Sequence, residues 1–431
     1  MTDLSKFAAA MKVKKVVLCS DNSTDKSSWK RYFVEAGVPV AQVITTSSFQ
    51  EASEALSKNP DIFMTGQYVN NQSCIELVDR HIEKQPDRSR AWTFVCTENN
   101  SLLLSSYLAE KNVDGIILKP YNSQDISDSL GPSLIAKLEM KKETKLYHEI
   151  LALVKTDQLD EASEKLEVFK KGKEQNPYPY YLEGLIKEGR NNIDEALEFY
   201  FKSLKFDEKN YLVLSRLFDL LMANRDYEQA YSCAEVLSEN HPINPNRSPE
   251  MIRASIATKN FENLIKFCDA ILNSTGNIAG LEKPLAAALI VAAKSLASAP
   301  KARDLVIDAL RRGVSLIDRN SPIFISALET FLMVDDLVDT KKLLDEIPSD
   351  EMDEDLLAID LEYTYKSTTP VAAFEKAQGL VKIDKANEKS YLILLKAAKE
   401  LGKDSNKLED MAFDAARIFP DLKNEFLNAI K

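Results

Sequence analysis

The chain has 431 residues, which is long enough for two or more domains, each with its own core. Apolar residues make up 45% and charged residues 28% of it, an ordinary composition for a soluble protein. The formal net charge is −12, most of it after residue 140. This balance disfavours a general nucleic-acid binder, because such proteins need a basic face to neutralise phosphates.

Membrane insertion, disulfides and metal binding are also disfavoured. No apolar run approaches 18 residues, and the apolar run near the N-terminus is too short for a signal peptide, so we expect a cytoplasmic protein without membrane insertion. The five cysteines form no CxxC pair, which favours buried free thiols. The three histidines, His81, His148 and His241, share no metal-ligand spacing, so we expect neither a metal nor another cofactor.

Strand-like and helix-like segments alternate over residues 1–130. Five apolar segments are predicted as strands: 14–20, 40–48, 61–65, 91–97 and 115–119. The segment 49–59 between the second and third carries its apolar residues on one helical face. Apolar strands separated by amphipathic helices predict a parallel sheet covered on both faces. The fold predicted for this part is therefore a flavodoxin/CheY-like doubly wound five-stranded sheet, with any site at the carboxyl ends of the strands.

The residues at these strand ends form a recognisable set: Ser20 and Asp21, Gly66, Thr97, and Lys119 with Pro120. In order and spacing this set resembles the receiver domain of bacterial response regulators over about residues 12–130. In that family two acids follow the first strand, a phosphoacceptor aspartate the third, Thr or Ser the fourth, and Lys-Pro the fifth. The run "PDIFMTG" places Gly66 at the phosphoacceptor position, Ser20 replaces the first acid, and Ile116 stands at the aromatic switch position.

The chemistry of phosphorylation is missing from this set. Transfer of a phosphoryl group to a receiver needs a carboxylate nucleophile and Mg²⁺ held by carboxylate oxygens. Gly66 has no side chain, and only Asp21 remains of the three acids. Asp61 begins its strand, about 17 Å from the site at 3.3 Å per residue, which is too far to substitute. We predict a pseudo-receiver in which Lys119 bonds Thr97, Asp21 or a backbone carbonyl.

The resemblance also implies a partner-binding face on the receiver-like domain. In the family it is formed by the fourth and fifth helices with strand five, and here it would include Tyr107, Lys111 and Tyr121.

A helical junction is predicted over residues 131–142. Gly131-Pro132 suits the start of a helix, because proline is tolerated in the first turn. From Pro132 to about Lys155 the pattern stays helical, and no flexible Gly/Ser linker occurs. We expect one helix to run from the α/β domain into the next domain.

Residues 143–431 are predicted as a helical repeat. The motifs QLDEA, NIDEA and DYEQA place Ala162, Ala196 and Ala230 at intervals of 34 residues. A small residue there lets two antiparallel helices approach closely, and the period is that of the tetratricopeptide repeat. The repeat's signature positions are matched in two units: Tyr180, Gly184, Ala196 and Tyr200, then Leu214, Ala230 and Pro242. Later units are less regular, and about eight helix pairs are expected to stack into a right-handed superhelix.

In tetratricopeptide proteins the first helix of each pair builds the inner, partner-binding face. By that resemblance, the inner-face residues are Tyr147, Leu151, Tyr178, Tyr181, Leu185, Leu212, Ser215 and Asp219. For each of them, packing between helices is the alternative role. The positions that hold a carboxylate in co-chaperone repeats carry tyrosine and leucine here, so a hydrophobic helix or an extended peptide is the expected ligand.

No catalytic motif occurs, so we expect no enzyme: GxGxxG, GxxxxGK[ST], HExxH and GxSxG are all absent.

The leading hypothesis is a cytoplasmic bacterial signalling adaptor that binds proteins, and the resemblance suggests motility, polarity or two-component regulation. Two alternatives stay open: a phosphorylated response regulator with tetratricopeptide output, and a transcriptional or RNA-binding regulator. A homodimer through either domain also stays open.

Overall fold

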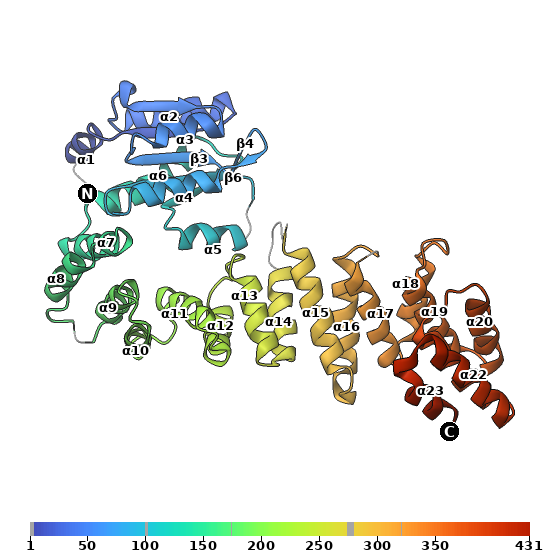
Figure 1. The fold of residues 1–431 in the computed structure, drawn as a ribbon. Helices are drawn as coiled ribbons and strands as arrows, with labels where there is room; N and C mark the ends of the chain where they lie inside the picture. Colours follow the sequence, from blue (N-terminus) through green and yellow to red (C-terminus); the bar gives the residue numbers. More distant parts are fainter. Residues whose placement is uncertain (1–3, 100–101, 174, 274–279, 320) are drawn as a thin grey trace. The chain divides into compact units, whose positions relative to one another are not determined.

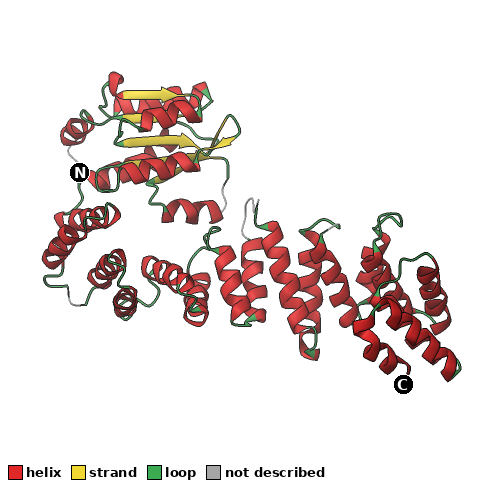
Figure 2. Ribbon diagram, in the orientation of Figure 1, coloured by secondary structure: helices red, strands yellow, loops and turns green. Residues whose placement is uncertain are grey.

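The computed structural model describes residues 4–99, 102–173, 175–273, 280–319 and 321–431 (Figure 1). The chain forms two compact units, one within residues 1–254 and 271–277, the other within 255–270 and 278–431. Strands occur in the first unit, and helices dominate the remainder of the described chain (Figure 2). None of the described helices is both long enough and apolar enough to span a membrane.

The first unit begins with a parallel sheet of five strands. They are β1 (Val16–Cys19), β2 (Val43–Thr46), β3 (Ile62–Gly66), β6 (Trp92–Thr97) and β7 (Gly115–Leu118), in the order β2-β1-β3-β6-β7. Each strand overlaps a predicted segment, so the prediction of a five-stranded parallel sheet is confirmed. The strand β2 starts later than expected, because Val40–Gln42 form a 3₁₀ turn, η1, directly after Pro39.

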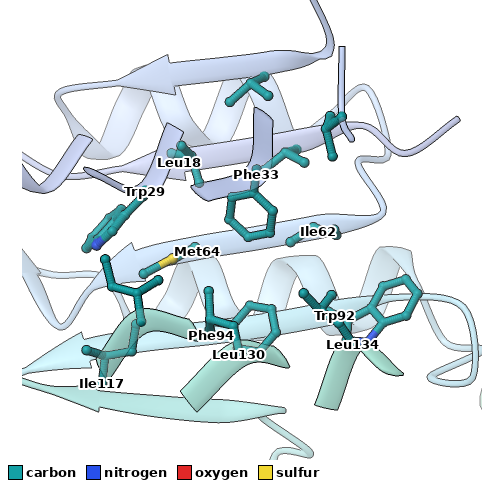
Figure 3. Close-up of a cluster of buried hydrophobic side chains, with 14 of the residues drawn as sticks. Leu18, Trp29, Phe33, Ile62, Met64, Trp92, Phe94, Ile117, Leu130 and Leu134 are labelled. Atoms are coloured by element: carbon teal, nitrogen blue, oxygen red, sulfur yellow. The ribbon is translucent and has the colours of Figure 1, made fainter. Parts of the chain in front are cut away.

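Helices cover both faces of this sheet. One face carries α1 (Leu4–Met11), α2 (Ser23–Glu35) and α6 (Ser123–Leu138), and the other carries α3 (Phe49–Leu56), α4 (Ile75–Lys84) and α5 (Leu102–Glu110). Successive side chains of a strand point to opposite faces of the sheet, so each strand contributes to both cores. Leu18 faces the first helix layer, and Val17 faces the second. Figure 3 shows the first core, where Trp29 and Phe33 of α2 pack against Met64. The five described cysteines are free and buried, as predicted.

A short hairpin between β3 and α4 was not predicted. The strands β4 (Tyr68–Val69) and β5 (Gln72–Ser73) pair antiparallel across Asn70 and Asn71, whose φ angles are 50° and 60°. Two residues with positive φ between paired strands favour a type I′ turn, in which asparagine is common.

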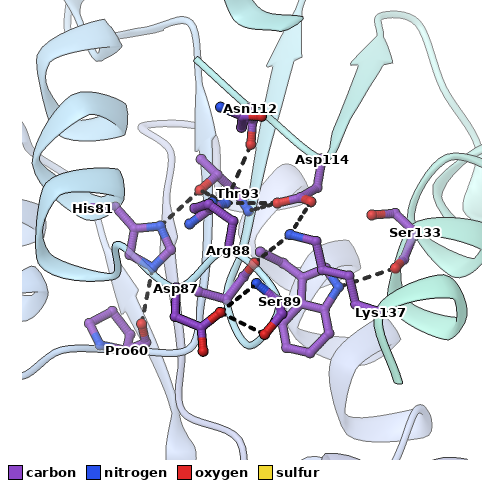
Figure 4. A network of polar contacts seen from close by, with 12 residues as sticks. Pro60, His81, Asp87, Arg88, Ser89, Thr93, Asn112, Asp114, Ser133 and Lys137 are labelled. Atoms are coloured by element: carbon purple, nitrogen blue, oxygen red, sulfur yellow. Dashed lines mark hydrogen bonds and ion pairs between the residues drawn. The ribbon is translucent and has the colours of Figure 1, made fainter. Parts of the chain in front are cut away.

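A buried polar network lies at the amino edge of the sheet (Figure 4). Arg88 pairs with Asp114 at 2.8 Å and donates to Thr93 Oγ1 at 3.0 Å, and Lys137 also pairs with Asp114. The ring of His81 bonds Thr93 Oγ1 at 2.9 Å through Nδ1 and the Pro60 carbonyl at 3.0 Å through Nε2. Burial, helped by the charge of Arg88, lowers the pKa of His81 to about 3. The imidazole is therefore neutral in the folded protein near pH 7.

The predicted single helix from Pro132 to about Lys155 is wrong. The helix α6 begins at Ser123, because Asn122 and Asp125 form a capping box in which each side chain accepts from the other's backbone N–H. Pro132 therefore lies inside α6, which ends at Leu138. A new helix, α7 (Lys142–Lys155), starts after the extended residue Lys141.

Three helix pairs follow within the first unit. The first helices are α7, α9 (Pro177–Gly189) and α11 (Tyr211–Ala223), and the second helices are α8 (Leu159–Phe169), α10 (Ile193–Leu204) and α12 (Tyr227–Asn240). Ala162, Ala196 and Ala230 are fully buried in the second helices. The period also appears in the backbone, where positive φ recurs every 34 residues at Asp157, Asn191, Arg225 and Lys259.

The remaining helices continue this pattern. In order they are α13 (Ser248–Ala257), α14 (Phe261–Leu272), α15 (Glu282–Leu296), α16 (Arg303–Ser315), α17 (Pro322–Met333), α18 (Leu337–Asp345), α19 (Glu354–Ser367), α20 (Pro370–Lys382), α21 (Glu388–Glu400), α22 (Ser405–Ile418) and α23 (Lys423–Ile430). Among the described residues, α7 to α22 are thus sixteen helices, or eight successive pairs. The last helix, α23, buries Phe426 against Ala412 and Ala415 of α22.

Candidate functional site

The carboxyl edge of the sheet is organised by an aspartate that the sequence analysis did not select. Asp25, in the first turn of α2, is only 6% exposed. Its Oδ2 lies 2.8 Å from Lys119 Nζ and accepts from Ser20 Oγ at 3.2 Å, and its Oδ1 accepts from the Tyr121 hydroxyl. Asp25 therefore joins α2 to residues that follow β1 and β7. The expected partners of Lys119 were Thr97, Asp21 or a backbone carbonyl: its backbone N–H does donate to the Thr97 carbonyl oxygen at 2.9 Å, but its ammonium pairs with Asp25 instead.

The charge of Asp25 shifts the titration of its two neighbours. Burial opposes the charge on Lys119, but the hydrogen bond and the charge of Asp25 outweigh it, so the pKa of this lysine is raised. Burial and the same carboxylate raise the pKa of Tyr121. At neutral pH Lys119 is therefore charged and Tyr121 is a neutral phenol.

The other predicted residues of this edge contact the hairpin β4–β5 or Gln67, the residue directly before it. Asp21 Oδ2 accepts from the backbone N–H of Asn70 at 2.7 Å, and the Thr97 hydroxyl donates to Gln67 Oε1. Gly66 lies beneath the hairpin, since an added Cβ would stand 3.0 Å from the Tyr68 carbonyl oxygen. The structure thus places all five predicted residues at the carboxyl edge and divides them between Asp25 and the hairpin.

A hollow of about 550 Å³ opens beside Lys119 and Tyr121, with Asp25 and Glu98 also in its wall. Gly66 and Asp21 do not line it. Within the described residues, no group of three or more His, Cys, Asp or Glu side chains is arranged to hold a metal ion. Because Asp25 uses both carboxylate oxygens for protein contacts, it serves here as a bridge between elements.

The three residues expected on a receiver partner face pack against different parts of the α/β fold. Tyr107 packs against the core on the α3–α5 side of the sheet, whereas Tyr121 packs against the core on the α2–α6 side. Lys111 follows α5 and pairs with Asp79 of α4 at 2.8 Å, with its ammonium 5.5 Å from the centre of the Tyr107 ring. Lys111 and Tyr107 are therefore in direct contact, and whether the three residues bind a partner stays a prediction.

Six of the predicted inner-face residues of the repeats line one hollow of about 890 Å³. They are Tyr147 and Leu151 of α7, Tyr178, Tyr181 and Leu185 of α9, and Leu212 of α11. We call this space the repeat hollow. The other two do not line it: Ser215 is buried and donates to the Leu212 carbonyl oxygen at 3.2 Å, and Asp219 forms a double ion pair with Arg247, with N···O distances of 2.9 and 2.7 Å.

Aromatic rings form one wall of the repeat hollow. The Tyr147 ring meets that of Tyr178 edge-on at 5.4 Å between centroids and that of Phe169 at 6.1 Å. The Tyr147 hydroxyl is buried and has no hydrogen-bond partner among the described residues, and burial raises its pKa. Tyr178 and Leu212 are 40% and 37% exposed, so both offer apolar surface to a ligand.

Charged groups stand around this apolar wall. Arg216 and Glu188 pair across α11 and α9 with an Nε–Oε2 distance of 2.9 Å, and Glu188 also accepts from Tyr200. Lys155, at the end of α7, also lines the hollow. Asn112, from the loop after α5, belongs to the same lining.

Sequence reasoning missed several of the lining residues. Val154 follows Tyr147 and Leu151 at helical spacing and was readable from the pattern. Phe169 lies on a second helix, and Asn112 lies in the α/β part of the chain, so only the three-dimensional arrangement brings them to the hollow.

Comparison with known proteins gives limited information. No protein-family model and no curated protein matches the chain. It is similar to the solved structure of a tetratricopeptide repeat protein from Parabacteroides merdae, with 15% identity and a TM-score of 0.29, over 62% of this chain and 96% of that one. It is also similar to Naa15/Naa10 bound to HypK-THB, with 14% identity and a TM-score of 0.28, over 66% of this chain and 60% of that one. At these TM-scores, neither similarity supports an argument about function.

Proposed function

We propose that the protein is a non-enzymatic adaptor that binds other proteins or peptides in the repeat hollow. The observation that carries this proposal is the convergence of six inner-face tyrosines and leucines on one space of about 890 Å³. Tyrosine supplies a large apolar surface with a polar tip at a low entropic cost, which is why it is common in binding sites. The ligand we propose is an apolar helix or extended segment that buries the exposed faces of Tyr178 and Leu212.

We further propose that the α/β part is a pseudo-receiver with a flavodoxin/CheY-like winding. Counting only the five parallel strands along the chain, their order is 2-1-3-4-5, which is the order of that doubly wound class. Gly66 cannot form an acyl phosphate, and Asp25 already neutralises Lys119. A role in bacterial motility, polarity or two-component signalling in the cytoplasm rests on the resemblance alone.

Peptide selection on the full chain tests the proposed binding function. Peptides selected from a random 12-residue library would be labelled and titrated against the wild-type protein, Leu185→Arg, Tyr178→Ala and Phe201→Ala. Leu185→Arg places a charge in the hollow and should abolish binding, and Tyr178→Ala should weaken it about tenfold, equal to about 1.4 kcal/mol.

Phe201→Ala is the matched control. Phe201 is 38% exposed, close to the value for Tyr178, but it lies on α10 and does not line the hollow. Its replacement should leave binding unchanged. Selected peptides that bind Leu185→Arg as tightly as the wild-type protein would contradict the proposed site.

A further inference from the structure

The last turn of α5 makes a concentrated polar contact with the third helix pair and the loop after it. Glu110 Oε2 accepts from the Tyr211 hydroxyl at 2.7 Å and from the Asn244 side-chain amide, and Oε1 lies 2.5 Å from Arg247 Nη2. Burial opposes ionisation of Glu110, but these three donors outweigh it and lower its pKa. We call Glu110, Tyr211, Asn244 and Arg247 the latch. All four lie in the first compact unit.

The latch is supported on both sides. Arg247 is held in place by its two bonds to Asp219 of α11, and its side chain is 14% exposed. One turn before Glu110, the Ser106 hydroxyl donates to the Ile243 carbonyl oxygen at 3.0 Å. The α5 surface is therefore occupied by residues of the chain's own repeat region.

The latch lies beside the repeat hollow. Asn112, which lines the hollow, follows Glu110 by two residues. Leu212 and Arg216, which also line it, follow Tyr211 on α11 by one and five residues. The contact that fastens α5 to α11 thus also fixes part of the wall of the hollow.

We propose that the α/β part of the chain gates the repeat hollow, with the Glu110–Arg247 ion pair as the central contact of the latch. With the latch closed, Asn112 stays against the hollow and limits the entry of a protein segment. Opening the latch moves Asn112 away and frees the α5 surface. The proposal rests on the proposed function of the hollow, because it describes how access to that site is regulated.

Amide hydrogen exchange on the full chain tests the latch without any ligand. Glu110→Gln removes the charge of one partner and Arg247→Met that of the other while keeping their size. Each should speed the exchange of residues 106–112 and 241–247 about tenfold, because these amides exchange through opening of the contact. Arg253→Met is the matched control, because Arg253 pairs with Glu250 at 3.0 Å in the same part of the chain but touches no latch residue. Its exchange in both segments should equal that of the wild-type protein.

The association rate of a peptide selected on the wild-type protein tests the gate. The rate should rise several-fold in Glu110→Gln and Arg247→Met and stay unchanged in Arg253→Met. Unchanged exchange in the latch variants overturns the latch, and faster exchange with an unchanged association rate overturns the gate alone. Binding that is insensitive to Leu185→Arg overturns the proposed function, and the exchange data would still report on the latch separately.

Discussion

Lys119 Nζ lies 2.8 Å from Asp25 Oδ2, so the lysine that follows β7 is neutralised by a carboxylate from the first turn of α2. The Asp25 and Lys119 side chains are 8% and 28% exposed, which limits solvent screening of the pair. In the pseudo-receiver that we propose, Lys119 corresponds to the lysine beside the phosphoacceptor aspartate of the receiver family, and Gly66 stands at the position of that aspartate. In the proposed pseudo-receiver, a buried contact between α2 and the residues after β1 and β7 thus stands where the phosphoacceptor chemistry would be.

Removing the charge of Asp25 should destabilise the α/β part of the chain. Asp25→Asn leaves Lys119 without a counter-ion in a partly buried place, and we expect a loss of about 2 kcal/mol in the free energy of unfolding. Urea unfolding followed by tryptophan fluorescence measures this part selectively, because both tryptophans, Trp29 and Trp92, lie in its core.

Two comparisons separate the ion pair from general damage. The double variant Asp25→Leu/Lys119→Met should lose less stability than Asp25→Asn, because no unpaired charge remains. Glu35→Gln breaks the exposed pair of Arg31 and Glu35 and should leave the free energy of unfolding nearly unchanged, because solvent screens exposed ion pairs. Equal losses in Asp25→Asn and Glu35→Gln would show that the Asp25 contact is unimportant.

Gly66 is expected to resist both phosphorylation and substitution. With a small phosphodonor and Mg²⁺, no acid-labile phosphate should form on the wild-type protein, and Gly66→Asp should not restore it, because Asp25 holds Lys119. Gly66→Ala should lower stability by about 1–2 kcal/mol, since the new Cβ would stand 3.0 Å from the Tyr68 carbonyl.

Gly131→Ala is the control for this substitution. Gly131 lies inside α6, and an added Cβ would meet only the Tyr32 hydroxyl at 3.8 Å. This variant should gain up to about 1 kcal/mol from helix propensity. Phosphate on wild-type residues 1–130 would overturn the pseudo-receiver proposal.

The positions of the strand-end residues were predictable, whereas their partners were not. Continuous apolar runs gave the five parallel strands, and parallel strands end at one edge, so Ser20, Thr97 and Lys119 had to lie near one another. The role of Asp25 depends on the side of α2 that faces this edge, which the sequence around Asn22 does not reveal. The Asn70-Asn71 pair was a readable turn signal that was overlooked.

In the repeats, too, the positions of residues were predictable and some of their contacts were not. A period of 34 residues placed Tyr147, Tyr181 and Leu185 on first helices, and the structure brings them to one hollow. The contribution of Asn112 could not be read, because it depends on a contact across about 100 residues of chain between Glu110 and Tyr211. Pro132 misled the prediction of a helix start, because the capping box at Asn122 is the stronger local signal.

Gly184 is expected to be essential for the packing of α9 against α10. An added Cβ would stand 2.5 Å from Tyr200 Cε1, and Tyr200 is fully buried and bonded to Glu188 at 2.7 Å, so it cannot retreat. Gly184→Ala should therefore cost about 2 kcal/mol or more through overpacking. Far-ultraviolet circular dichroism during thermal unfolding measures the loss of the repeats.

Gly379→Ala serves as its matched control. Gly379 also lies within a helix, α20, but no atom lies within 4 Å of an added Cβ. This substitution should stabilise the protein by up to about 1 kcal/mol. A similar effect of the two substitutions would contradict the close approach of α9 and α10.

Protonation of His81 should make the α/β part unstable in mild acid. The folded pKa of about 3 lies below the unfolded value of about 6.5, so the unfolded chain takes up the proton first. The stability due to neutral His81 is complete above about pH 6.5 and falls as the pH drops toward 3, by about 1.4 kcal/mol per pH unit. Urea unfolding followed by tryptophan fluorescence measures this stability. Between pH 7 and pH 5, the free energy of unfolding should fall by about 2 kcal/mol less in His81→Asn than in the wild-type protein. If the free energy of unfolding falls equally with pH in the two proteins, the neutral imidazole between Thr93 and Pro60 does not cause the loss of stability in acid.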